Sequence, residues 1–327
     1  MVSKTKYPVE SSTVRALFLK AGFDDVSDIK PLGKGEFNAV FSANASIADS
    51  SEAKGYVMKI APPDNIPVMT YEKNMMETEI YWYETAVEST PVKTPKIYYS
   101  DFSKSSINTS YFIMDKIEGL TLDQFPKDRK EEADKQIAII TGYLHNVKGI
   151  GYGYVQNGLK SNWYEAIRSM TEAVVGDCAE KNKSPEKGEK LLGYIDRYKD
   201  VLIGADSRMV SFDLWQPNVI HDGANFVWID PERGFWGDPV MDLVCLEPMR
   251  ALEEKTISLN AHNEVSDLKI EITLETSIRY GIALAYLALI MDTERYYRYS
   301  PVYKGWWRNI LASKMMYTNA FNRLERH

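Results

Sequence analysis

Residues 210–232 read VSFDLWQPNVIHDGANFVWIDPE. The HDGAN segment lies between two short apolar runs, and its Asp-Gly and Asn suit a tight turn between two strands. A hairpin here would place Asp213 and Asn218 just before the first strand and Asp230 at the end of the second. We therefore expect three oxygen-bearing side chains to meet at one edge of a small sheet.

Such a set provides the groups that magnesium-dependent phosphoryl transfer needs. Asp213 would accept the proton of the attacking hydroxyl, while Asn218 and Asp230 would hold the metal against the nucleotide phosphates. The alternative interpretation is that Asp213 and Asn218 cap turns, which these residue types often do.

On these residues, and on the run GDPVMDL at 237–243, the sequence resembles the aminoglycoside phosphotransferase and choline kinase family of small-molecule kinases, relatives of the protein kinases. The family pattern is His-Gly-Asp-x-x-x-x-Asn, then a strand ending in Asp, then Gly-Asp-Pro-x-x-Asp-Leu. Ser211 and Phe212 replace the His and Gly, a departure that concerns the shape of the loop more than its chemistry. Asp238 and Asp242 are expected to be structural.

The resemblance extends to a glycine turn near the N-terminus. Residues 29–41 read IKPLGKGEFNAVF, two apolar runs broken by a turn. Gly33 and Gly35 would let the backbone approach the nucleotide phosphates closely, and Asn38 stands near a position where the family often has Asn or Ser. A plain hairpin is the alternative.

Lys59 lies among apolar residues of a predicted strand, 55–61. The resemblance implies that it binds the α- and β-phosphates and pairs with a Glu of the next helix. That helix, about 71–88, offers Glu77 and Glu79. Glu79 is preferred because the Glu of the family is usually followed by apolar residues four and seven positions on, here Tyr83 and Ala86, and Glu77 stays open. The alternative is an outward-facing Lys on an edge strand.

Residues 111–119 read YFIMDKIEG, a strand that enters a Gly-containing connection. This resembles the family's hinge, in which the backbone carbonyl of Asp115 and the backbone amide of Ile117 would bind adenine. An ordinary central strand would have the same composition.

The resemblance implies an α+β, bilobal protein-kinase-like fold. Residues 1–115 would form an N-terminal nucleotide-binding lobe with a small antiparallel sheet. Residues 116–327 would form a larger, mostly helical catalytic and substrate-binding lobe, with the active site in the cleft. His145, near the end of a predicted helix, is expected to be a packed or capping histidine.

The charge and the residue composition limit the kinds of partner that the protein is expected to bind. The net charge of -7 and the pI of about 5.4 argue against a nucleic-acid binder. We see no signal-peptide pattern and no run of about 20 apolar residues, which predicts no membrane partner. Two distant cysteines, Cys178 and Cys245, predict no disulfide framework and a cytoplasmic location. The oligomeric state stays open.

We therefore expect a Mg²⁺-dependent phosphotransferase that moves the γ-phosphate of ATP or GTP to a hydroxyl of a small, aminoglycoside- or sugar-like molecule. Two alternatives stay open: a metabolic amino-alcohol or homoserine-type kinase, and a nucleotide-binding pseudokinase that regulates a partner. From residue 249 onward basic residues slightly outnumber acidic ones, which weakens the aminoglycoside assignment. Aromatics in this part, Trp306 and Trp307 among them, would stack on a flat substrate or pack between helices.

Overall fold

The structure, a computed structural model, describes residues 3–33, 36–47, 52–248 and 250–326. The chain forms two compact units. The division falls at 118–119, where the sequence suggested 115–116, and it assigns residues 69–94 to the second unit. Unit 1 comprises Met1–Val68, Pro95–Glu118 and Tyr297–Tyr299, and unit 2 comprises Met69–Thr94, Gly119–Tyr296 and Ser300–His327.

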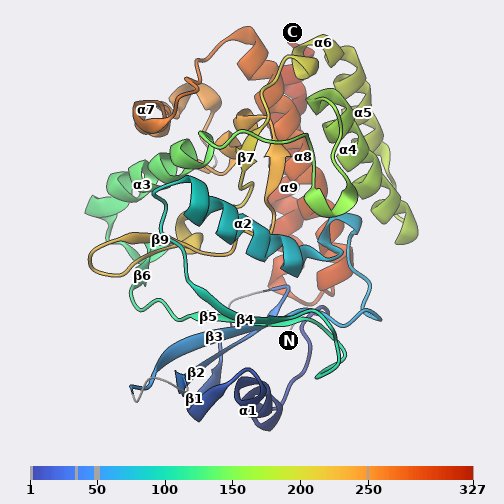
Figure 1. The fold of residues 1–327 in the computed structure, drawn as a ribbon. Coiled ribbons are helices and arrows are strands. Elements are labelled where there is room, and N and C mark those ends of the chain that lie inside the picture. Colours follow the sequence, from blue (N-terminus) through green and yellow to red (C-terminus); the bar gives the residue numbers. More distant parts are fainter. Residues whose placement is uncertain (1–2, 34–35, 48–51, 249, 327) are drawn as a thin grey trace. The chain divides into compact units, whose positions relative to one another are not determined.

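Unit 1 contains a five-stranded antiparallel sheet and one helix (Figure 1). The strand order is β1-β2-β3-β5-β4, and each neighbouring pair is antiparallel. The elements are α1 (Ser11–Lys20), β1 (Phe23–Pro31), β2 (Ala39–Ile47), β3 (Lys54–Ile60), β4 (Ile97–Asp101) and β5 (Tyr111–Asp115).

The helix α1 packs against the sheet through apolar residues on one of its faces. Val14, Leu17 and Phe18 recur at the spacing of one helix face and are buried. Phe18 packs edge-on against Phe23 at 5.4 Å between ring centroids, and Phe23 in turn packs against Tyr56 at 4.8 Å. The aromatic contacts therefore join the helix to the first and third strands.

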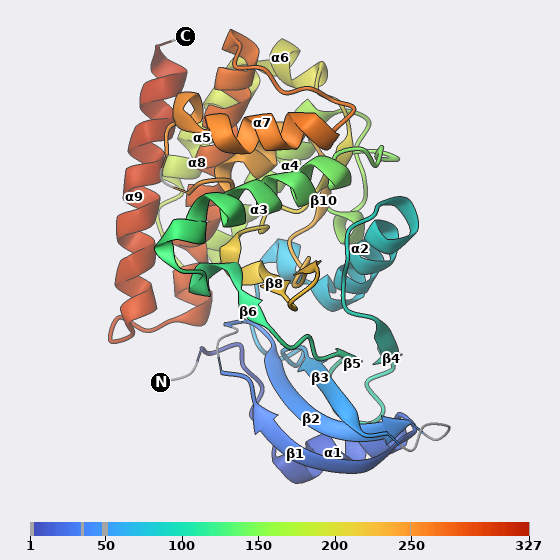
Figure 2. The same ribbon diagram turned by 90° about the vertical axis from the view of Figure 1, so that its left-hand side faces the viewer.

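Unit 2 is mostly helical. Helices α3 and α7 run side by side, as do α4 and α5, and α8 and α9 (Figures 1 and 2). The helices are α2 (Met75–Ser89), α3 (Lys130–Leu144), α4 (Trp163–Glu180), α5 (Glu186–Arg197), α6 (Lys199–Ile203), α7 (Thr256–Val265), α8 (Leu274–Arg298) and α9 (Lys304–Glu325).

The helix α8 is long and apolar enough to cross a membrane by length and composition alone. In the structure 67% of its most apolar window is buried, as expected for a helix in a protein core. After α8, Trp306 packs against Tyr296 at 5.4 Å, and Arg295 stacks on both rings, whereas Trp307 is exposed. Trp306 is therefore a packing residue.

Short strands of unit 2 frame the loop at 211–218. The predicted hairpin is present: β8 (Val219–His221) pairs antiparallel with β9 (Phe226–Trp228), with Val219 opposite Trp228. The strand β6 (Leu120–Thr121) extends this sheet, and β7 (Arg208–Val210) pairs with β10 (Phe235–Gly237). An antiparallel sheet in one unit and helices in the other make the fold α+β, as the sequence predicted.

Candidate functional site

The β8–β9 hairpin brings the three predicted residues to one end of the small sheet. The Asn218 Nδ2 donates a hydrogen bond to the backbone carbonyl of Asp213 at 2.9 Å. The backbone N–H of Ile229 donates to the Asn218 carbonyl at 2.9 Å, which places Asp230 next to that pair. Because the Asn218 nitrogen holds the loop, its amide oxygen is the acceptor atom that a metal could use.

A buried carboxylate holds the backbone of the loop before Asp213. The Asp242 side chain, 1% exposed, accepts hydrogen bonds from the backbone N–H groups of Ser211 at 3.0 Å and Phe212 at 2.6 Å. The His145 Nε2 lies 3.0 Å from the same carboxylate. Asp242 and His145 are therefore structural, as expected. Asp238 caps the following 3-10 helix at the Val240 N–H.

The loop keeps a backbone shape that suits glycine although its residue is Phe212. The φ of Phe212 is 53°, in the left-handed region, which costs a non-glycine residue roughly 1–2 kcal/mol. Its ring is fully buried against Phe235 and Tyr286, and burial of a Phe side chain is worth about 1.5–3 kcal/mol. The packing can thus offset the strain at the position where the family has Gly.

A chain of buried histidines supports Asp242. The Asn263 amide is oriented by its bonds to Ile270, so its Oδ1 is the acceptor that faces His262 Nδ1 at 2.9 Å. His262 Nε2 must then accept from His145 Nδ1, 2.8 Å away. His145 Nε2 meets a carboxylate oxygen, so one further proton must be shared between His145 and Asp242.

The backbone of Asp230 is held by the helix α2. Asp230 has a φ of 64°, and its N–H donates to the Tyr83 hydroxyl at 2.8 Å. Glu79 lies one helical turn before Tyr83 on the same face of α2. Glu79 is fully buried and Glu77 is exposed, so of the two only Glu79 faces inward.

Three carboxylates gather around Asp230. One oxygen each from Glu79, Asp230 and Glu232 lie within 4.8 Å of one another. Carboxylate oxygens are the ligands that Mg²⁺ prefers. The donor set therefore fits a divalent cation. Sequence reasoning missed Glu232, although its place two positions after Asp230 was a signal.

Arg233 was also missed, and it lies beside the predicted base. Its Nε is 3.7 Å from the Asp213 Oδ2, and its Nη2 donates to the Glu294 carboxylate at 2.5 Å. Burial acts to lower the pKa of Arg233, but the charges of Glu294, Tyr71, Asp213 and Glu232 outweigh it and raise that pKa. Arg233 therefore stays cationic next to the Asp213 carboxylate.

In unit 1, Lys59 lies in a central strand. It pairs with Val40 of β2 and Phe112 of β5, and it is 5% exposed. The alternative of an outward-facing Lys on an edge strand is therefore wrong. Because Lys59 belongs to unit 1 and Glu79 to unit 2, their pairing stays a prediction.

The predicted glycine turn joins β1 to β2. The Leu32 N–H donates to the Val40 carbonyl at 2.8 Å, which closes the turn. Gly33 lies in the turn, and Asn38 is 5% exposed just before β2. Gly35 lies outside the described residues, so its part in phosphate binding stays a prediction.

The predicted hinge follows β5. The Lys116 N–H donates to the Gly55 carbonyl of β3 at 3.1 Å. In an extended chain successive groups face opposite sides, so the Asp115 carbonyl and the Ile117 N–H face away from β3. This geometry is compatible with adenine binding, which stays a prediction.

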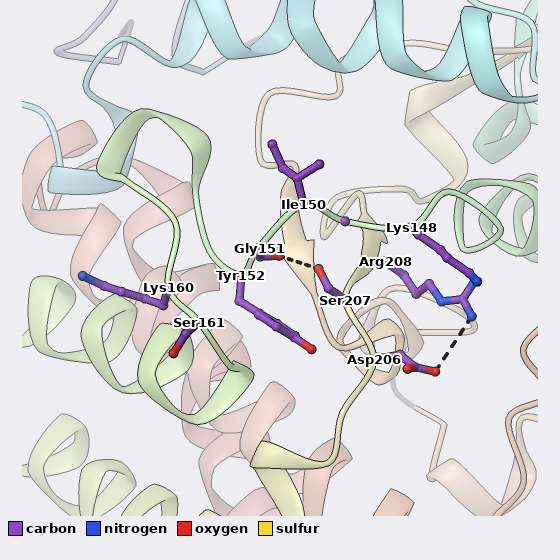
Figure 3. Close-up of a pocket in the computed structure, with 10 residues that line it drawn as sticks. Lys148, Ile150, Gly151, Tyr152, Lys160, Ser161, Asp206, Ser207 and Arg208 are labelled. Carbon is purple, nitrogen blue, oxygen red and sulfur yellow. Dashed lines mark hydrogen bonds and ion pairs between the residues drawn. The ribbon is translucent and has the colours of Figure 1, made fainter.

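A hollow of about 430 Å³ lies at the start of β7, at the strand end opposite to the Asp213 loop (Figure 3). Arg208 at its wall pairs with Asp206 and Asp267 and donates to the His145 carbonyl. Of the predicted site residues that the structure describes, none lines it. The lining residues are Lys148, Gly149, Ile150, Gly151, Tyr152, Lys160, Ser161, Asp206, Ser207 and Arg208.

No family model and no curated protein matches the sequence. Solved structures with a similar fold are found when the three-dimensional structure of the chain is compared with them. A fructosamine-3-kinase-like protein from Haemophilus somnus has a TM-score of 0.64 at 15% identity, over 92% of this chain and 95% of that one. A thermostable mutant of aminoglycoside phosphotransferase APH(4)-Ia has a TM-score of 0.62 at 16% identity, over 95% and 98%. APH(2")-IIIa, solved with GDP and kanamycin, has a TM-score of 0.60 at 15% identity, over 94% and 98%.

These structures define the fold of the chain. It is the protein-kinase-like fold of the aminoglycoside phosphotransferases and of a fructosamine-3-kinase-like protein. The resemblance predicted from the sequence is confirmed at this level. The alignments extend over nearly the whole of each chain, so both units take part in the likeness.

Replacing Asp242 by Asn should destabilise the protein by about 2–4 kcal/mol, because a neutral amide is a weaker acceptor than a carboxylate for the two buried backbone N–H groups and has only one accepting atom. Chemical denaturation would measure the free energy of unfolding. The exposed Asp128→Asn is the control and should stay within about 0.5 kcal/mol of wild type. A wild-type value for Asp242→Asn would contradict the structural role.

The stability should also depend on His262. Burial, with His145 beside it, lowers the pKa of His262 from 6.5 to about 3. In the unfolded chain the His262 ring is protonated as the pH falls through about 6.5, whereas in the folded chain it is protonated only near pH 3. The free energy of unfolding therefore has its full value above pH 6.5, and below that pH it falls by up to about 1.4 kcal/mol per pH unit.

Urea unfolding at pH 7.5 and pH 5.0 would measure this effect for wild type and His262→Gln. The wild type should lose about 2 kcal/mol more than the variant over this interval. Equal losses would show that His262 is not held neutral.

Proposed function

We propose that the protein is a Mg²⁺-dependent phosphotransferase that moves the γ-phosphate of ATP or GTP to a hydroxyl of a small molecule. The observation that carries the proposal is the grouping of Asp213, Asn218 and Asp230 at one end of the β8–β9 hairpin. The buried Asp242 holds the loop that presents Asp213. If Asp213 and Asn218 only capped turns, the loop would not need a buried carboxylate to hold its backbone.

In this proposal Asp213 orients the acceptor hydroxyl and accepts its proton as the phosphorus–oxygen bond forms. Arg233 favours the ionised form of this carboxylate through its charge. Lys59, in the sheet of unit 1, binds the α- and β-phosphates. Positioning and charge neutralisation supply most of the rate, since phosphoryl transfer asks for little covalent chemistry from the protein.

Asn218 and Asp230 would hold the metal, with Glu79 and Glu232 as further carboxylates within reach of Asp230. Bound Mg²⁺ would neutralise charge on the nucleotide phosphates. Tyr83 contributes by fixing the backbone of Asp230.

The acceptor we propose is sugar-like or aminoglycoside-like. Trp215, two residues after Asp213, is 44% exposed and offers an apolar face on which a sugar ring could stack. Among the structures with this fold, APH(4)-Ia has been solved with AMP-PNP and hygromycin B, and another relative is fructosamine-3-kinase-like. We also propose a cytoplasmic location, which the two free, buried cysteines support.

Purified protein should hydrolyse or transfer phosphate from ATP or GTP with Mg²⁺ and one acceptor from a panel of aminoglycosides, sugars, fructosamines and amino alcohols. Asp213→Asn should lower kcat by roughly 10²- to 10⁴-fold, because it removes the proton acceptor without changing the shape of the side chain. Coupled detection of nucleoside diphosphate would measure the turnover.

The matched control is Asp200→Asn, an exposed carboxylate on α6, which should keep wild-type turnover. Asp230→Asn should lose the metal dependence of nucleotide binding. Nucleotide binding without transfer to any acceptor would favour the pseudokinase alternative, and absence of nucleotide binding would refute the proposed function.

A further inference from the structure

The glycine turn of unit 1 is held at its second half, after the two glycines. Phe37 and Asn38 are buried, at 6% and 5% exposure. Two segments that are far apart in the sequence contact this half of the turn, and both belong to unit 1. The family patterns in the sequence gave no indication of either contact.

The first segment is the N-terminal stretch. The hydroxyl of Thr5, a fully buried residue, donates to the Glu36 carbonyl at 2.9 Å. The Lys6 ammonium donates to the Gly33 carbonyl at 3.3 Å. These bonds attach the backbone of the turn at its first glycine and at Glu36.

The second segment is the C-terminal end of the long helix α8 with the residue that follows it. The Tyr299 hydroxyl donates to the Glu36 carboxylate, and the Arg298 guanidinium lies over the Phe37 ring at 5.3 Å from its centroid. Tyr299 is 2% exposed and Arg298 is 5% exposed. The Lys4 N–H donates to the Arg298 carbonyl at 2.9 Å, so the two segments also support each other.

A glycine-rich turn has many accessible conformations, and ordering it around a nucleotide costs conformational entropy. Contacts that fix the turn before the nucleotide arrives reduce this cost. A charge-assisted bond, such as the one from Tyr299 to the half-buried Glu36 carboxylate, is well suited to this purpose because it is stronger than a neutral one.

We propose that Tyr299, with Arg298 and Thr5, is a positioning residue for nucleotide binding. These residues act through Glu36 and Phe37 and hold the second half of the glycine turn, residues 36–38, in place. The inference rests on the proposed function, because the turn must cover a nucleotide for its shape to matter.

Tyr299→Phe removes one hydroxyl and keeps the ring. We expect the KM for the nucleotide, and its dissociation constant measured by calorimetry, to rise roughly tenfold. The KM for the acceptor and kcat should stay within about twofold of wild type. Thr5→Val replaces the Thr5 hydroxyl by a methyl group of similar size, and it should raise the KM and the dissociation constant for the nucleotide as well.

The matched control is Tyr198→Phe, which removes a buried tyrosine hydroxyl that donates to the Leu324 carbonyl in unit 2. Its nucleotide constants should equal those of wild type. If Tyr299→Phe lowers the melting temperature as the control does but leaves the nucleotide constants unchanged, Tyr299 is only structural and the proposal is wrong.

Hydrogen exchange of the apo protein tests the anchor without a nucleotide. The peptide that covers residues 32–41 should exchange faster in Tyr299→Phe than in wild type or Tyr198→Phe. Unchanged exchange would show that Tyr299 does not hold the turn. If wild type binds no nucleotide, the proposed function fails and the positioning role with it, whereas faster exchange would still establish the anchor.

Discussion

The Asp242 carboxylate accepts hydrogen bonds from two successive backbone N–H groups in a site that water does not reach. Unpaired, such N–H groups would each cost about 1–3 kcal/mol, so the carboxylate and the loop at 211–213 depend on each other. Because Asp213 is the next residue in the chain, its direction follows from this bond pattern. Asn218 then closes the loop by donating to the Asp213 carbonyl.

The carboxylate of Asp242 is itself placed by helices that are distant in the sequence. His145 at the end of α3 and His262 on α7 form a chain of ring nitrogens that leads to Asp242. The tautomers are determined at the far end of this chain by the Asn263 amide, which cannot donate through its oxygen. The packing of α3 against α7 is therefore linked, bond by bond, to the shape of the loop that carries Asp213.

The local parts of this arrangement could be predicted from the sequence. One hairpin is defined by the Asp-Gly turn, by the apolar runs on either side of it and by the spacing of Asp213, Asn218 and Asp230. The pairing of its two strands depends only on residues that are close in the sequence. The fold could be recognised from the order of the motifs. Arg233 and Tyr83 were missed because their roles arise from long-range contacts, of Arg233 with Glu294 on α8 and of Tyr83 on α2 with Asp230, which local patterns do not encode. The bond between Tyr299 and Glu36 spans 263 residues, and no pattern in either segment indicates it.

The departure from the family pattern at 211 and 212 has a physical explanation. Asp242 binds backbone N–H groups, which every residue except proline provides, so the bonds do not depend on the side chains at these positions. The one requirement on residue 212 is the left-handed backbone, which glycine adopts at low cost and phenylalanine adopts with strain. Phe212 meets it by burying its ring against Phe235 and Tyr286. The loop geometry thus depends on a buried carboxylate and on core packing, and a different pair of residues can support the same placement of Asp213.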